Sequence, residues 1–95
     1  MFARVTKYKM KPGSRDAATA LMNQIKDQIM AMPGALNFVN VMNEDGSGYV
    51  ISVGESQEIS EANAPKVAEI WGQFAQFLEG APSPEGYDVI ANWSN

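Results

Sequence analysis

The sequence predicts a single α+β domain over residues 1–95, with elements in the order β-α-β-β-α-β. Three observations lead to this prediction. Residues 2–10 alternate between two faces as a strand does, two later segments repeat apolar residues at helical spacing, and Pro-Gly and Asp-Gly pairs separate the segments. A chain of 95 residues buries roughly 60–65% of its unfolded surface, which is enough for one modest core.

The first strand is expected over residues 2–10. Because successive side chains of a strand point to opposite faces, one face carries Phe2, Arg4, Thr6, Tyr8 and Met10. The other face carries Ala3, Val5, Lys7 and Lys9. The first face is thus either a core surface with a few polar positions or the floor of a pocket.

A helix should follow the turn at Pro12-Gly13, with Ser14 as its N-cap. Apolar residues recur at helical spacing from Ala18 to Met32, which predicts about five turns. Pro33-Gly34 should end this helix.

A β-hairpin is expected next. Residues 35–43 form its first strand, in which Leu36, Phe38 and Met42 share one face. Asp45-Gly46 supplies the positive φ that the turn over residues 44–48 requires, and residues 49–56 form the partner strand.

The last third of the chain predicts a helix and a strand. Residues 57–63 are polar apart from Ile59 and Ala62, so we expect only one or two loose helical turns there. Pro65 suits the first turn of a second main helix, whose apolar face runs from Val67 to Leu78 and for which Gly80 is the C′ candidate. Residues 87–93 read as the final strand.

Two βαβ halves joined by a hairpin give the ferredoxin-like pattern, a four-stranded antiparallel sheet with two helices on one face. Most of the strands are nevertheless apolar on both faces, as Val39 and Val41 opposite Phe38 illustrate. The face without helices therefore needs a cover. A second copy of the same sheet is the simplest one, so we expect a homodimer in which two sheets pack as a dimeric α/β barrel.

Composition excludes several kinds of function. The chain has no Cys and no His, which removes disulfides, thiolate chemistry, the usual general base and the commonest metal ligand. The carboxylates are scattered, so no metal site is expected. A net charge of −4, with nine acids against Lys66 in residues 44–95, disfavours nucleic acid as a partner. No signal peptide or membrane span is evident, so a cytoplasmic location is expected.

Several segments resemble the antibiotic biosynthesis monooxygenase-like family. They are the opening strand and turn, residues 2–13; the end of the first helix, Met32-Pro33-Gly34-Ala35-Leu36; and the strand from Tyr49 to Glu55 with the following Ser56-Gln57-Glu58. The resemblance implies a dimer with a pocket between helices and sheet in each subunit. Members include cofactor-independent oxygenases of polycyclic phenols, quinol oxygenases, haem-degrading enzymes, isomerases and proteins of unknown role.

The functional residues of the haem-degrading branch are missing. That branch uses an Asn on the first strand, a Trp on the second helix and a His further along that helix. The matching positions here are Thr6, one near Asn63, and one near Gln73 or Trp71. We therefore expect no haem degradation by that mechanism. Gly54 stands where a large aromatic residue is often found in the family, which would widen the pocket.

The first strand offers three candidate site residues, each with a structural alternative. The Thr6 hydroxyl either forms one hydrogen bond to the backbone or donates to a substrate oxygen. Arg4 either reaches solvent or an acid such as Glu55, or it clamps an anion or a carbonyl. Tyr8 is either a core residue with its hydroxyl at the rim or a hydrogen-bonding partner for a phenolate.

The second helix offers two more candidates. Asn63 either caps the helix that contains Pro65 or orients a carbonyl or enolate oxygen in a pocket. Trp71 either packs in the core or forms a stacking wall for a flat aromatic ligand. Tyr87 and Trp93 are expected in dimer or core contacts, and Asn92 suggests no role.

Two functions follow as hypotheses. The first is a small monooxygenase-like enzyme that oxidises a small aromatic or quinol-type molecule without metal or organic cofactor. Thr6 and Asn63 would act at the reacting oxygens, Arg4, Tyr8 and Trp71 would bind substrate, and the general base is unassigned. The alternative is a non-catalytic small-molecule-binding or structural dimer. A third possibility is an isomerase or lyase of the same superfamily, which the sequence does not distinguish from the other two.

Overall fold

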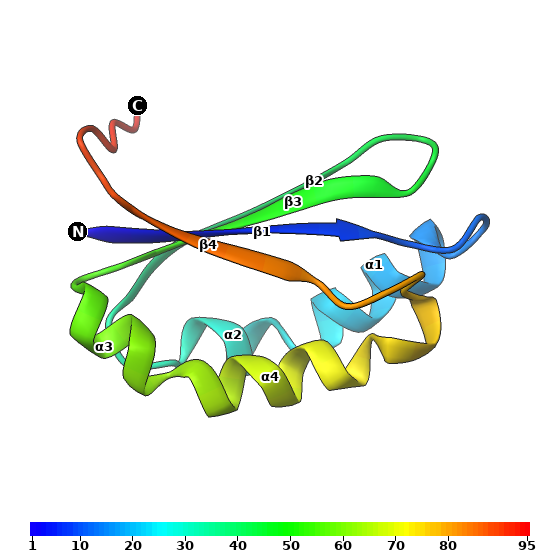
Figure 1. The fold of residues 1–95 in the computed structure, drawn as a ribbon, viewed down its shortest axis with the longest axis horizontal. Coiled ribbons are helices and arrows are strands. Elements are labelled where there is room, and N and C mark those ends of the chain that lie inside the picture. The colour runs from blue at the N-terminus through cyan, green and yellow to red at the C-terminus, as the bar shows by residue number, and fades with distance from the viewer.

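The computed structural model describes residues 1–95 and contains the predicted succession of elements (Figure 1). The strands form one antiparallel sheet in the order β2-β3-β1-β4, which confirms the ferredoxin-like topology. The elements are β1 (Phe2–Lys9), α1 (Arg15–Gln24), α2 (Lys26–Met30), β2 (Ala35–Met42), β3 (Ser47–Gly54), α3 (Gln57–Ala62), α4 (Ala64–Gln73), a 3-10 turn (Ala75–Phe77) and β4 (Ser83–Asp88).

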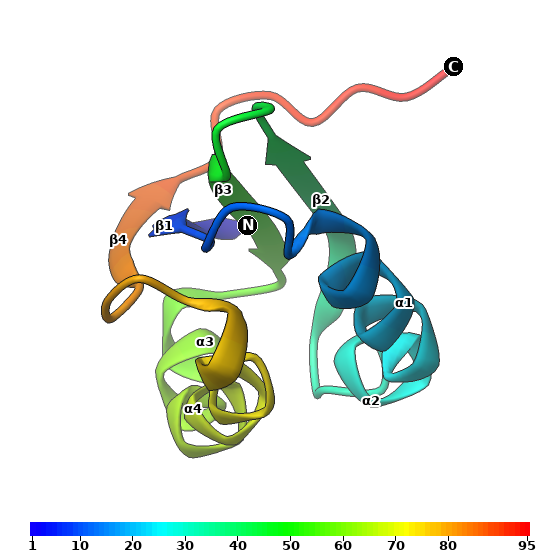
Figure 2. The same cartoon turned by 90° about the vertical axis from the view of Figure 1, so that its right-hand side faces the viewer.

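All helices lie on one face of the sheet. Figure 1 shows the sheet as one layer and the helices as a second, and Figure 2, seen from the end, shows α1 and α2 side by side with α3 and α4 beneath the strands. The opposite face of the sheet carries no helix. No helix is both long and apolar enough to span a membrane.

β1 separates its two faces as its alternation predicts. Thr6, Tyr8 and Met10 are each only 3% exposed on the face that meets the helices. Lys7 and Lys9 on the other face are exposed. The main core cluster joins this helix-facing side of β1 to the apolar sides of α1, α2 and α4, through Tyr8, Met10, Ala18, Ile25, Ile29, Ile70 and Phe74.

Two glycines allow aromatic rings of β1 to lie flat over the neighbouring strands. Gly48 on β3 pairs with Tyr8, and a Cβ there would lie 2.6 Å from the Tyr8 hydroxyl and 2.1 Å from the Val41 carbonyl oxygen. Gly86 on β4 pairs with Arg4, and a Cβ there would overlap the ring of Phe2. The missing side chains let Tyr8 reach across β3 toward β2.

The structure corrects the prediction for the first strand of the hairpin. The register between β2 and β3 shifts between Ala35 and Asn37, which is a bulge. Because a bulge inserts one residue, Leu36 leaves the face of Phe38 and is 41% exposed, while Ala35 lines the helix side instead. The positive φ predicted in the turn is present at Gly46, at 90°.

The helix ends also differ from prediction. Ser14 and Asn63 stand at N-cap positions but have helical backbone angles, so neither side chain accepts a capping hydrogen bond. Ser56 has extended angles, and its Oγ accepts from the N–H of Ile59 at 3.2 Å. The first long helix is interrupted at Ile25, whose φ and ψ are −102° and 12°.

The end of the chain differs most. α4 ends at Gln73 and a 3-10 turn follows, so Gly80 is not the C′ residue and has no positive φ. The last strand covers Ser83–Asp88 rather than residues 87–93. Pro84 is tolerated there because β4 is an edge strand that pairs only with β1.

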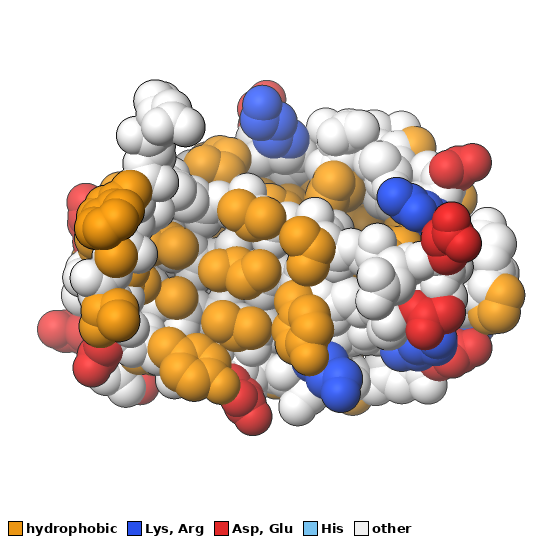
Figure 3. Space-filling view, turned by 90° about the horizontal axis from the view of Figure 1, so that it is seen from above, with side chains coloured by type: hydrophobic (Ala, Val, Ile, Leu, Met, Phe, Trp, Pro, Cys, Tyr) orange, Lys and Arg blue, Asp and Glu red, His pale blue; other side chains and the backbone are white.

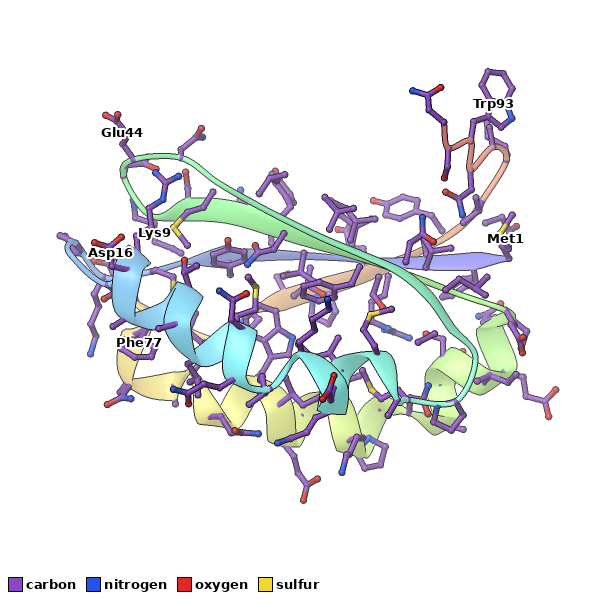
Figure 4. The ribbon with its side chains drawn as sticks, turned by 180° about the vertical axis from the view of Figure 1, so that it is seen from behind. Met1, Lys9, Asp16, Glu44, Phe77 and Trp93 are labelled. Carbon is purple, nitrogen blue, oxygen red and sulfur yellow. The ribbon has the colours of Figure 1, made fainter.

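The residues after β4 form a tail over the open face of the sheet. Asn92, for which the sequence suggested no role, accepts a hydrogen bond at Oδ1 from Asn37 Nδ2 at 3.2 Å. Trp93 on this tail is 93% exposed and projects away from the sheet in Figure 4. Trp93 therefore makes no core contact within the subunit, and Ile90 is 98% exposed as well.

The open face of the sheet is largely apolar. Figure 3 shows hydrophobic side chains gathered across it, with charged side chains toward the edges. Val39, Val41 and Tyr49 each expose between 44% and 48% of their surface here, and Tyr87 exposes 49%. A patch of this kind on a small domain is typical of an interaction surface.

Candidate functional site

A cavity of about 100 Å³ lies between the helix layer and the helix-facing side of the sheet. Its floor comes from alternate residues of β1, β2 and β3, and its walls come from the helices. All five residues singled out in the sequence line it: Arg4, Thr6, Tyr8, Asn63 and Trp71. A volume of this size holds several waters or part of a small organic ligand.

Arg4 is the only charged side chain in the cavity lining. It is half-buried and donates from Nη2 to Ser60 Oγ at 3.2 Å. The expected alternative of an ion pair with Glu55 is wrong, because the chain's two ion pairs are Lys9–Asp45 and Lys66–Glu69. The guanidinium therefore keeps most of its donors free at the cavity wall.

Thr6 carries a hydroxyl that no protein group satisfies. The residue is 3% exposed and lines the cavity, yet its side chain forms none of the molecule's side-chain hydrogen bonds. No fully enclosed polar side-chain atom lacks a partner, so the Thr6 oxygen is accessible to water, and the cavity is the space that Thr6 lines. The structural alternative, one bond to the backbone, is therefore wrong.

Tyr8 is buried but uses its hydroxyl within the protein. It donates to Asn40 Oδ1 at 2.6 Å and lies 3.1 Å from the Val41 carbonyl oxygen. Burial raises the pKa of the Tyr8 phenol, although the Asn40 bond and the Arg15 charge act in the opposite direction. Tyr8 is thus a neutral phenol near pH 7, suited to accepting a hydrogen bond and unsuited to removing a proton.

Asn63 joins two loops at one end of the cavity. Its Nδ2 donates to the Pro33 carbonyl oxygen at 2.9 Å, which ties the α3–α4 junction to the turn before β2. The capping role considered from the sequence is wrong, because the side chain points to Pro33 rather than to its own helix. Its Oδ1 remains available to a donor in the cavity.

Trp71 combines both roles that the sequence left open. Its ring centroid lies 5.8 Å from that of Tyr8 and 6.4 Å from that of Phe74, so the indole packs in the aromatic core. It also lines the cavity, on the helix side opposite the sheet floor. Four of the six methionines complete the apolar wall: Met10, Met22, Met32 and Met42.

Sequence reasoning missed four polar residues that line the cavity: Thr19, Asn40, Ser52 and Ser60. Asn40 accepts from Tyr8, and Ser52 pairs with Arg4 across β3. The signal was present in the alternation of β2 and β3, since Asn40 shares a face with Phe38 and Met42. Using it requires the strand register, which a single sequence does not specify.

The cavity contains no titratable group besides Arg4 and Tyr8. No group of three or more His, Cys, Asp or Glu is arranged to hold a metal ion. The arrangement can hold an apolar ring between Trp71 and the sheet while donors from β1 meet its oxygens. It offers no side chain that would remove a proton from such a ligand near pH 7.

No family model and no curated protein matches the chain, so the comparison rests on solved structures. An antibiotic biosynthesis monooxygenase superposes with a TM-score of 0.75 at 10% identity, covering 96% of this chain and 100% of that one. A protein of unknown function from Nitrosomonas europaea gives 0.80 at 16% identity, covering 99% and 93%.

A third structure is a monooxygenase from the gene ActVA-Orf6 of Streptomyces coelicolor, in complex with the ligand nanaomycin D. It superposes with a TM-score of 0.76 at 19% identity, covering 99% of this chain and 91% of that one. This chain has the fold of the antibiotic biosynthesis monooxygenases. The resemblance expected from the turns and strands is therefore confirmed for the fold.

Proposed function

We propose that the chain is a cofactor-independent oxygenase that oxidises a small aromatic or quinol-type molecule in the cavity between helices and sheet. The observation that carries the proposal is the Thr6 side chain, which is 3% exposed, lines the cavity and forms no side-chain hydrogen bond with the protein. A ligand oxygen in the cavity could therefore accept a hydrogen bond from its hydroxyl.

The chemistry requires an electron-rich substrate, which supplies the electrons that reduce O2. For a phenol that becomes a quinone, one oxygen atom enters the ring and the other leaves as water, so one phenol and one O2 give one quinone and one water. Thr6 and Asn63 would hold substrate oxygens, Trp71 would stack on the ring, and Arg4 and Tyr8 would orient it.

We further propose that the protein is a homodimer whose open sheet faces pack together. The apolar side chains Val39, Val41 and Tyr49 support this arrangement, because a stable interface buries about 800 Å² on each partner and favours an apolar centre. Trp93 and Ile90 extend the same apolar surface beyond β4.

A binding experiment followed by an activity assay tests the function. Thermal shifts against quinols, polycyclic phenols, flavins and haem would identify the ligand class, since a ligand at a hundredfold excess over Kd stabilises by about 2.7 kcal/mol. Oxygen uptake with the stabilising class would then test catalysis. We expect uptake with wild type and little with the Thr6→Val variant.

The second candidate is a non-catalytic binding dimer, and one observation favours it. The cavity has no carboxylate, imidazole or amine that could act as a base. A ligand that stabilises the protein without any oxygen uptake would make this second function the better description.

A further inference from the structure

We infer that the cavity binds its aromatic ligand as an oxygen anion held by Arg4, and that the ligand loses its proton to water before it binds. The inference rests on the proposed function and narrows its substrate class. The ligand would be a phenol, hydroxyquinone or enol acidic enough to ionise near neutral pH.

The cavity carries one positive charge and no negative charge. Its lining contains Arg4 and not one Asp, Glu or Lys. A half-buried guanidinium without a carboxylate partner is unfavourable, because desolvation is not offset by an opposite charge. An anionic ligand oxygen would supply that charge and could accept two parallel N–H bonds from the guanidinium.

No carboxylate elsewhere in the protein forms an ion pair with Arg4. On its outer side Arg4 borders a groove that Glu61 of α3 and Asp88 and Tyr87 of β4 also line. Neither carboxylate forms an ion pair with it, and its one side-chain hydrogen bond is to the neutral Ser60 Oγ. β3 contributes only the uncharged Ser52 beside it.

Two further hydrogen-bond donors lie next to Arg4 on the sheet. Ser52 lies directly across from Arg4 in the sheet, and Thr6 follows two residues along the same face of β1. Both line the cavity, and the Thr6 hydroxyl has no protein partner. Donors from Arg4, Ser52 and Thr6 could therefore converge on one oxygen anion at the sheet floor.

The cavity also lacks a base. The chain has no His and no Cys, and besides Arg4 the only titratable group that lines the cavity is the Tyr8 phenol. That phenol already donates to Asn40 Oδ1 and its pKa is raised by burial. The proton of the ligand must therefore leave to solvent, which limits the ligands to those that are acidic by themselves.

Matched ligands test the inference with the intact protein. Para-nitrophenol ionises near neutral pH and its phenolate is coloured, whereas para-nitroanisole is a neutral ether of similar shape. We expect calorimetry at pH 8 to give binding of the phenolate about 10- to 100-fold tighter than binding of the ether, the range for hydrogen bonds to a charged group.

The pH profile gives a second measurement that needs no variant. The chain has no His and no Cys, the side chains that ordinarily titrate near neutral pH. Affinity should therefore rise with the ionised fraction of para-nitrophenol. The phenolate absorbance should also show that the bound phenol has a pKa lower by about 1 or more than the free one.

Variants assign the effect to Arg4. Arg4→Gln should reduce phenolate affinity by about 10- to 100-fold and leave ether affinity within about twofold. Arg4→Lys should retain part of the preference, because the charge remains without the planar fork. Lys26→Gln, which removes an exposed charge on α2 outside the cavity, is the matched control and should change neither affinity.

Three outcomes would overturn the inference. They are equal binding of the ether and the phenolate, an affinity that does not follow ionisation, and a phenolate preference that survives in a folded Arg4→Gln variant. Failure of the phenolate to bind at millimolar concentration also counts against it. The proposed oxygenase activity fails separately, when ionised phenols bind as expected and no oxygen is consumed.

Discussion

At the scale of single residues, Thr6 distinguishes a site from ordinary packing. The polar groups of buried residues normally find a partner within the protein, whereas Thr6 is 3% exposed, lines the cavity and forms no side-chain hydrogen bond. Replacing it with a side chain of the same shape tests what the hydroxyl does without opening a void.

We expect Thr6→Val to leave the free energy of unfolding within about 1 kcal/mol of wild type, because no protein hydrogen bond is lost. Affinity for a phenolate should fall by about 10- to 100-fold, the range for a hydrogen bond to a charged group. Urea unfolding and calorimetry measure the two quantities. Ser83→Ala on β4, which removes an exposed hydroxyl outside the cavity, is the control, and a destabilisation of several kcal/mol at Thr6 would argue for a structural role.

Tyr8 is the residue with a predictable response to pH. Because the pKa of its phenol is raised in the folded protein, the unfolded chain loses this proton first as pH rises past about 10. The stability linked to Tyr8 is therefore fully present below pH 10 and is lost above it.

Tyr8→Phe should lower the free energy of unfolding at pH 8 by about 1–3 kcal/mol, because Asn40 Oδ1 loses its donor. The variant should also lose less stability than wild type between pH 8 and pH 10.5. Urea unfolding at both values measures this, and an identical loss in the two proteins would mean that Tyr8 does not carry the dependence.

At the scale of elements, β3 shapes the floor of the cavity because Gly48 has no side chain. Gly48 leaves the space in which the Tyr8 ring crosses from β1 toward Asn40 of β2. The polar connection across the floor of the cavity therefore depends on a glycine that has no polar group of its own.

We expect Gly48→Ala to destabilise the protein by about 2–3 kcal/mol, because the new Cβ would overlap the Val41 carbonyl and the Tyr8 hydroxyl. Gly72→Ala on α4 is the matched control, with nothing within 4 Å of the added Cβ. It should stabilise the helix by about 0.5–1 kcal/mol. Thermal or urea unfolding compares them, and equal effects would show that Gly48 has no special position.

The sequence predicted the elements better than their ends. Strict alternation identified β1, and Gly46 identified the hairpin, since both signals are local. The bulge at Leu36 and the position of β4 depend on pairing with other strands, and β4 contains Pro84 and Gly86, which are poor strand formers. Arg4, Thr6 and Tyr8 were found because alternation fixes the face of β1, Trp71 because of its helical spacing, and Asn63 from the family resemblance, whereas Asn40 required the register between strands.

At the scale of the whole molecule, the open face of the sheet is the surface on which we propose that two subunits pack. Val39 lies within its apolar surface and is 48% exposed in the single subunit. If two such faces pack together, a carboxylate at this position becomes buried without a partner, which is costly.

Val39→Glu should therefore convert a dimer of wild type into a monomer at micromolar concentration, as measured by light scattering after gel filtration. Ala20→Glu, an exposed position on α1 away from this face, should remain dimeric. A monomer mass for wild type would overturn the proposed dimer, and a dimer mass for Val39→Glu would place the interface elsewhere.

The methionine wall of the cavity has a consequence for the lifetime of an oxygenase. Thioethers are readily converted to sulfoxides, and this change turns a flexible apolar side chain into a polar one. Any reduced oxygen species that escapes reaction with substrate would meet Met10, Met22, Met32 or Met42 first. Peptide mass spectrometry after turnover should find more added oxygen on these four than on Met1 and Met30, which are 54% and 39% exposed and would be oxidised first by peroxide from solution. The order in which the methionines oxidise would thus record where the oxygen was activated.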